Sequence, residues 1–147
     1  MKGYTLIFSK ADQDSGISIV RIGTDLGEFE GMAECCFDDL PQFSKFFGCR
    51  IAELRAGAKY AKAKIKYWRT RLEALENYKG TMCTTRNWND NDYYVKKLYQ
   101  HIKAAQKELN RWKVIYSARQ DQIKAAITER DKYIAEMGAR ADDSIYG

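Results

Sequence analysis

The stretch that decides the fold is residues 51–79, IAELRAGAKYAKAKIKYWRTRLEALENYK. Its apolar residues recur at alternating steps of three and four, at Ile51, Leu54, Ala58, Ala61, Ile65, Trp68, Leu72 and Leu75. Such steps line up apolar side chains along one face of an α-helix, as in the a and d positions of a coiled coil. The stretch therefore predicts a long helix that packs against a second helix.

The second helix is predicted after a polar loop at 80–92. The same rhythm returns at Val95, Leu98, Ile102, Ala105, Leu109, Trp112 and Tyr116. Gly80 is the expected end of the first helix, Asn89 or Asp90 the cap of the second, and Gly138 its end. A short loop favours an antiparallel hairpin. The predicted register pairs Trp112 with Ala58, so that large residues meet small ones, and places Arg119 opposite Ile51.

The N-terminal region predicts β-structure. Residues 4–10 and 17–24 are rich in β-branched and aromatic residues and flank the turn ADQDSG, which favours a β-hairpin. Residues 30–40 fit either a third strand or a short helix. Asp39 followed by Pro41 resembles a helix start, and because Gly48 can interrupt a helix, the sequence allows a short helix before the long one. The expected class is α+β and predominantly helical: an acidic β-hairpin region at 1–40, a basic helical hairpin at 41–138 and a frayed tail at 139–147. Together they are expected to form one compact domain.

Charge is distributed unevenly along the chain. The net charge is +5, but residues 1–44 hold 3 Lys/Arg against 8 Asp/Glu, and residues 45–147 hold 22 against 12. The basic part therefore favours a polyanion or an acidic protein surface as its partner. Pairing with the chain's own basic helices is the simpler explanation of the acidic segment Asp25–Asp39.

The candidate contact residues are basic and aromatic side chains outside the predicted seam. They are Arg55, Lys59, Tyr60, Lys62, Lys64, Lys66, Tyr67, Arg69 and Arg71 of the first helix, and Lys103, Lys107 and Arg111 of the second. Such a mixture offers phosphate contacts and surfaces on which bases can stack. The alternative is an ordinary solvated face. Trp88 in the loop is a candidate anchor for a partner, and Tyr60 and Tyr67 suggest a homodimer as a further variant.

Catalytic, metal and membrane signatures are absent from the sequence. There is no glycine-rich phosphate loop, nucleophile elbow or dinucleotide fingerprint. Cys35, Cys36, Cys49 and Cys83 form no C-x-x-C pair, and residues 87–92 lack the glycine and glutamate of a calcium loop. Without a leader or a long apolar run, we expect a cytoplasmic protein with reduced thiols and no cofactor.

Two hypotheses follow. The first is a non-catalytic protein whose basic hairpin engages nucleic acid or a nucleic-acid-handling complex. In architecture alone, residues 45–137 resemble the tRNA-binding arm of seryl-tRNA synthetases, with no shared motif. The second is a protein–protein interaction module, such as an assembly factor. A short chain of this type is similar to phage or mobile-element accessory proteins, including inhibitors of host defence.

Overall fold

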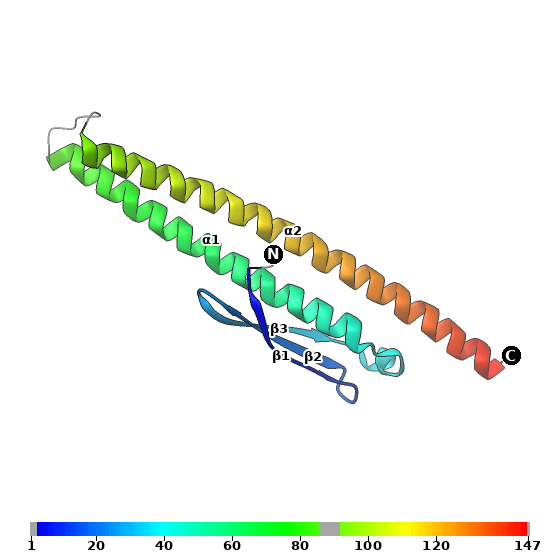
Figure 1. Cartoon of the computed structure of the whole chain (residues 1–147). Helices are drawn as coiled ribbons and strands as arrows, with labels where there is room; N and C mark the ends of the chain where they lie inside the picture. Colours follow the sequence, from blue (N-terminus) through cyan, green and yellow to red (C-terminus); the bar gives the residue numbers. More distant parts are fainter. Residues whose placement is uncertain (1–2, 86–91, 147) are drawn as a thin grey trace. The chain divides into compact units, whose positions relative to one another are not determined.

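The structure is a computed structural model that describes residues 3–85 and 92–146. Three strands precede a short 3-10 helix and two long α-helices (Figure 1): β1 Thr5–Asp12, β2 Ile17–Thr24, β3 Gly27–Glu34, η1 Phe37–Gln42, α1 Lys45–Thr85 and α2 Tyr93–Tyr146. The predicted α+β class, predominantly helical, is confirmed. The chain forms two compact units, here called the sheet unit (Met1–Tyr60 with Ser117–Gly147) and the hairpin unit (Ala61–Tyr116).

The sheet is antiparallel, with its strands in the order β1-β2-β3. The β1–β2 hairpin is confirmed, and residues 30–34 belong to the third strand rather than to a helix. Gly16 and Gly27 have φ angles of 70° and 108°, and both follow turns where only glycine adopts a left-handed backbone without strain. A bulge between Leu6 and Phe8 interrupts the β1–β2 register.

The connection from the sheet to α1 contains the short helix that the sequence allowed. Asp39 and Pro41 lie in this 3-10 helix, η1, and the break follows at Phe43 rather than at Gly48. The backbone is extended at Phe43, with ψ 132°, so the two helices are separate. Ser44 caps α1, since its Oγ accepts from the Phe47 N–H at 3.4 Å and its carbonyl accepts from the Gly48 N–H at 3.0 Å.

Small residues let α1 approach the sheet closely. A Cβ at Gly31 of β3 would collide with the backbone of Ala52 and Ala56, and one at Gly48 of α1 would collide with Ser18 of β2. Ala52, Ala56 and Ser18 are fully buried or nearly so. Sequence reasoning missed this contact, although Gly48, Ala52 and Ala56 recur every four residues and therefore share one helix face.

Both helices run past the glycines that were expected to end them. α1 continues through Gly80 to Thr85, and α2 continues through Gly138 to Tyr146. A glycine inside a helix costs only about 1 kcal/mol, and beyond Gly80 the buried Met82 packs with Leu98 and Ile102. α2 is capped by Asp92, whose Oδ1 accepts from the Tyr94 N–H at 2.8 Å. The predicted cap residues Asn89 and Asp90 lie outside the described residues, as does Trp88.

The helix seam is confirmed, but the predicted register is wrong. Leu98, Ile102, Leu109 and Trp112 are buried as expected. In the hairpin unit, Trp112 lies against Lys64 rather than Ala58, with 5.6 Å from the Lys64 Nζ to the ring centre.

The sheet unit shows the same displacement. Arg119 donates to the Gly57 carbonyl at 2.7 Å rather than facing Ile51, so each contact lies six residues further along α1 than predicted. This is close to one heptad, and a heptad slip keeps apolar residues in the seam. The apolar pattern alone therefore could not determine the register of α1 against α2. Arg119 does help to determine it, because its guanidinium requires a polar partner on α1. Gly57 leaves room for the Arg119 side chain and the Tyr4 ring, because a Cβ at residue 57 would lie 3.3 Å from the Tyr4 ring and 3.7 Å from the Arg119 Cδ.

Candidate binding surface on the helical hairpin

Positive charge is concentrated in the hairpin unit. Residues 61–116 contain 13 Lys/Arg and 5 Asp/Glu, a net charge of +8, whereas the sheet unit contains 12 and 15, a net charge of −3. The division at residue 44 separates more charge in total, −5 against +10, but the hairpin unit holds the denser positive charge, +8 within 56 residues. The hairpin unit is the part of the chain whose field attracts anions.

The first two cations of the predicted basic line are engaged by the sheet. The Arg55 guanidinium donates to the Met32 carbonyl at 2.8 Å, and the Lys59 ammonium donates to the Glu30 carbonyl at 2.7 Å. Both carbonyls belong to β3, an edge strand of the sheet. An edge strand exposes unpaired backbone groups, so α1 uses these two side chains to cover them. Arg55 and Lys59 thus stabilise the sheet unit.

Tyr60 is also part of the sheet unit, and it is buried rather than available for stacking. Its hydroxyl donates to Asp25 Oδ1 at 2.7 Å, and its ring centre lies 5.8 Å from that of Phe29. Asp25 begins the acidic segment. Its partner Tyr60 is neutral. Glu28 and Glu30 of the segment form ion pairs with Arg21 of β2, at 4.0 and 3.1 Å, rather than with a basic helix.

The same line of α1 continues in the hairpin unit as exposed side chains. Lys62, Lys66 and Arg69 follow one another at steps of four and three, and all three are exposed, as is Arg71. These steps keep Lys62, Lys66 and Arg69 on one face of the helix. Among the residues that the structure describes, none of these four forms an ion pair with a carboxylate.

Lys64 differs from its neighbours because it is buried. Its Nζ lies 5.6 Å from the centre of the Trp112 ring and 5.8 Å from that of the exposed Tyr67. Aromatic faces attract a cation and cover its aliphatic stem. Lys64 therefore belongs to the packing between the helices, and Tyr67 remains at the surface beside it.

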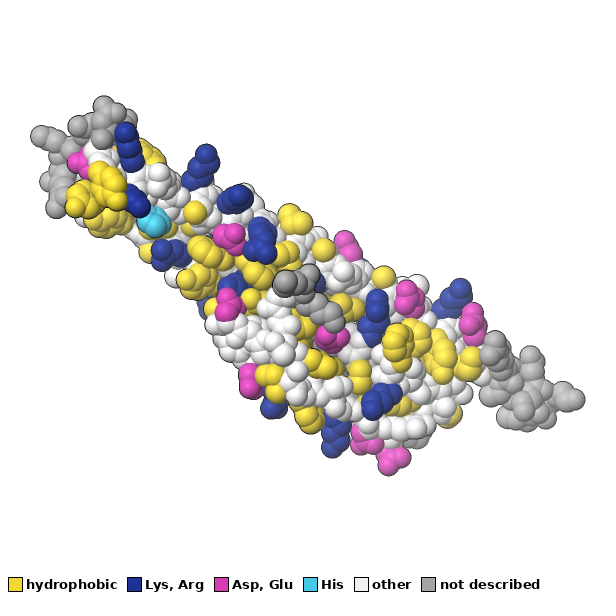
Figure 2. Space-filling view, viewed as in Figure 1, with side chains coloured by type: hydrophobic (Ala, Val, Ile, Leu, Met, Phe, Trp, Pro, Cys, Tyr) yellow, Lys and Arg dark blue, Asp and Glu magenta, His cyan; other side chains and the backbone are white. Residues whose placement is uncertain are grey.

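α2 presents its own exposed line of cations. Lys103, Lys107 and Arg111 recur every four residues and are all exposed, as are Lys96, Lys97 and Lys113. Arg111 forms an ion pair with Glu108 at 3.2 Å. By helical spacing, the line of Lys103, Lys107 and Arg111 lies away from the seam residues of α2. Figure 2 shows Lys and Arg side chains distributed along the hairpin on the face in view.

Exposed tyrosines accompany these cations, and sequence reasoning missed most of them. The exposed residues of the hairpin unit include the tyrosines Tyr67, Tyr78, Tyr93, Tyr94 and Tyr99. Only Tyr67 was predicted as a contact residue. The pair Tyr93-Tyr94 could have indicated exposed aromatic residues from the sequence, because it stands at a helix start where the seam does not require two large rings.

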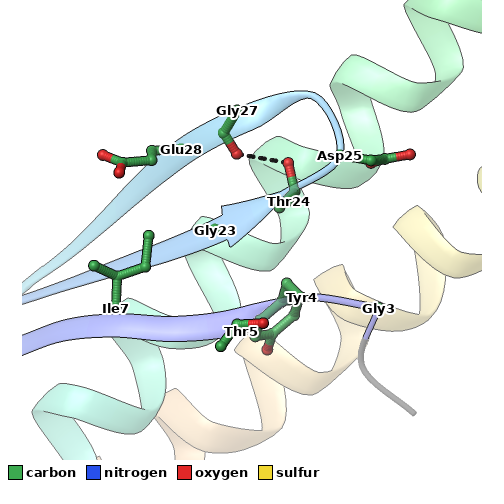
Figure 3. Close-up of a pocket in the computed structure, with 9 residues that line it drawn as sticks. All are labelled: Gly3, Tyr4, Thr5, Ile7, Gly23, Thr24, Asp25, Gly27 and Glu28. Atoms are coloured by element: carbon green, nitrogen blue, oxygen red, sulfur yellow. Dashed lines mark hydrogen bonds between the residues drawn. The ribbon is translucent and has the colours of Figure 1, made fainter.

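The sheet unit contains an open hollow of about 790 Å³ at the end where β2 turns into β3 (Figure 3). Thr24 and Gly27 face each other across the turn, with the Thr24 hydroxyl donating to the Gly27 carbonyl at 2.7 Å. Ile7, the bulged residue, lies against Gly23, where a Cβ would be 2.9 Å from its Cδ1. The two carboxylates of the lining are Asp25, which accepts from Tyr60, and Glu28. The hollow thus presents mainly glycine, backbone and apolar groups.

The remaining candidate groups are dispersed. Burial, and next the charge of Asp39, raise the pKa of the Cys35 thiol, so this thiol is a poor nucleophile. His101 is exposed. No three His, Cys, Asp or Glu side chains in the described ranges lie close enough to hold a metal ion. Within those same ranges, no helix is both long and apolar enough to cross a membrane.

Comparisons of the chain with protein-family models, with curated proteins and with solved structures gave no match. The charge and geometry of the hairpin unit are therefore the basis for assigning a function.

Proposed function

We propose that the protein is a non-catalytic binding protein whose hairpin unit binds nucleic acid. One observation carries the proposal: two exposed lines of cations, one on each helix, lie on a unit with a net charge of +8. Like charges at i, i+4 destabilise a helix by roughly 0.2–0.5 kcal/mol per pair. A purely structural hairpin gains nothing from this repulsion, whereas a phosphate backbone relieves it and releases counterions.

The proposed contact residues are the exposed members of the two lines. They are Lys62, Lys66, Arg69 and Arg71 of α1 and Lys103, Lys107 and Arg111 of α2, with Tyr67 beside them. Arg55 and Lys59 are not included because they bind carbonyls of β3. Tyr60 and Lys64 are not included because they are buried.

A salt titration tests the proposal. Fluorescence anisotropy with labelled single-stranded and duplex DNA and RNA gives the binding constant at each salt concentration. Contacts from about six cations predict that log K falls against log salt with a slope of roughly −4 to −5. Failure to bind any of these probes at low salt would exclude nucleic acid as the partner.

One observation favours protein binding as a second candidate function. β1 is the other edge strand of the sheet, and its Leu6 is 53% exposed beside Phe46 of α1, which is 66% exposed. These two residues line a groove of about 480 Å³ with Val20 and Cys49 in the sheet unit. An extended segment of a partner protein can add to such an edge as a fourth strand. A pull-down from the native cell distinguishes the two functions, because a protein partner survives nuclease treatment and a nucleic-acid partner does not.

A further inference from the structure

Exposed aromatic rings gather near the ends of the two helices of the hairpin unit. Tyr78 lies seven residues before the end of α1 and is 57% exposed. Tyr93 and Tyr94 begin α2 and are 65% and 71% exposed. Tyr99 follows, also exposed, and all four belong to the same compact unit. In the sheet unit, Tyr4 and Tyr133 are half-buried and Tyr60 is buried.

The rings are interleaved with cations. The Lys79 Nζ lies 4.8 Å from the centre of the Tyr99 ring, and the Lys97 Nζ lies 5.7 Å from that of Tyr93. The Tyr93 and Tyr94 rings meet edge to face at 5.5 Å. Each cation lies over one face of its ring, so a ligand that stacks on the opposite face of Tyr93 has a positive charge on the other side of the ring.

The packing of the hairpin does not require these rings. The seam near this end is filled by Met82, Leu98 and Ile102, with Leu72 and Leu75 beside them. The Tyr94 N–H is already satisfied by Asp92. Exposing a large apolar ring to water is unfavourable in proportion to its exposed apolar area. A ligand that covers the ring removes this area from water and therefore binds more favourably.

We propose that the hairpin unit binds single-stranded nucleic acid, with unpaired bases stacking on Tyr78, Tyr93 and Tyr94 while the neighbouring lysines contact phosphates. This inference rests on the proposed function and narrows it from nucleic acid in general to unpaired strands. In a duplex the base faces are already stacked on one another, and the helix presents only its edges and phosphates. An unpaired base offers a free face, and each stacking contact contributes roughly 1–3 kcal/mol.

The experiment uses the full chain and three probes of equal length: an oligothymidylate, a duplex, and an abasic deoxyribose-phosphate oligomer that keeps the charge but lacks bases. We expect the oligothymidylate to bind about tenfold or more tightly than the abasic oligomer. The variant Tyr93→Leu with Tyr94→Leu should lose about tenfold for the oligothymidylate. It should bind the abasic oligomer as the wild type does.

The matched control is Tyr93→Phe with Tyr94→Phe, which keeps both rings and should retain wild-type affinity. Because both residues are mostly exposed, circular dichroism should show the same melting temperature for both variants. Tyr78→Leu is a third variant, which tests the stacking role of Tyr78 independently. Equal binding of all three probes, unchanged by loss of the rings, would overturn the inference while leaving the proposed function intact. Absence of binding to every probe would overturn both.

Discussion

The two units use the same line of cations on α1 in different ways. In the sheet unit, Arg55 and Lys59 donate to carbonyls of β3. In the hairpin unit, Lys62, Lys66 and Arg69 continue the line at the same spacing and remain exposed. Lys59 is exposed as well, so the difference is the bonding partner: carbonyls of an edge strand in one case and solvent in the other. A regular charge pattern in a sequence therefore identifies a helix face, but it does not show whether the charged side chains stabilise the fold or bind a partner.

The packing of α1 differs in the same way. Toward the sheet it presents Gly48, Ala52 and Ala56, and the backbones approach until no Cβ fits at Gly31. Toward α2 in the hairpin unit, larger side chains such as Met82 and Trp112 fill the seam. Close contact of backbones leaves little freedom for change, whereas a seam of large side chains can adjust by rotamer shifts.

The largest expected effect is on the covered side of this comparison. Gly31→Ala places a methyl group against the backbone of α1 at Ala52 and Ala56. Because backbone atoms cannot turn aside as a side chain can, we expect a loss of about 3 kcal/mol in the free energy of unfolding. Urea denaturation followed by circular dichroism measures it.

The matched control is Gly80→Ala in the hairpin unit, where an added Cβ meets no atom of residues 3–85 and 92–146 within 4 Å. This change should raise the free energy of unfolding by about 0.5–1 kcal/mol, because alanine favours a helix over glycine. If Gly31→Ala were as harmless as Gly80→Ala, the close approach between α1 and β3 would be refuted.

A smaller effect concerns thiol reactivity and pH. Burial raises the pKa of the Cys35 thiol, so iodoacetamide should alkylate Cys35 more slowly than the exposed Cys36 and Cys83 near pH 8.

The folded state holds the proton of the Cys35 thiol more tightly than the unfolded chain does, in which the thiol titrates at roughly 8.5. The associated stability is therefore present below that pH and lost as pH rises through the folded-state value. Peptide mass spectrometry of timed samples measures the rates, and faster labelling of Cys35 than of Cys36 would contradict the assignment.

The sequence predicted the elements of the fold better than their contacts. The β-branched composition of residues 17–24 correctly indicated a strand, in which the structure buries Ser18, Val20 and Ile22, and the heptad steps correctly indicated a buried seam. These signals are local, so they survive in any arrangement of the elements. The register was missed by about one heptad because Trp112 finds a seam position on α1 in either alignment.

The candidate site was predictable only in part for a related reason. The exposed cations Lys62, Lys66 and Arg69 were identified from spacing, since nothing in the fold covers them. Tyr60 and Lys64 were predicted at the surface because the positions of β3 and Trp112 depend on contacts across the chain. The exposed Tyr93 and Tyr94 were overlooked because the aromatic residues considered as contacts were Tyr60 and Tyr67, which lie among the cations of the first helix, and Trp88 in the loop.

The central claim is that one basic line is divided into two structural cations and a set of binding cations. Two charge-matched variants test it, each removing two cations: Lys62→Ala with Lys66→Ala, and Arg55→Ala with Lys59→Ala. The measurement is the salt slope of oligothymidylate binding, with the unfolding midpoint recorded for each protein. We predict that the Lys62/Lys66 variant reduces the magnitude of the slope by roughly 1.4, or about 0.7 for each lost contact with a single strand, and keeps its stability. The Arg55/Lys59 variant should keep the slope and lose about 1–3 kcal/mol of stability. Equal slopes for the two variants would contradict this division.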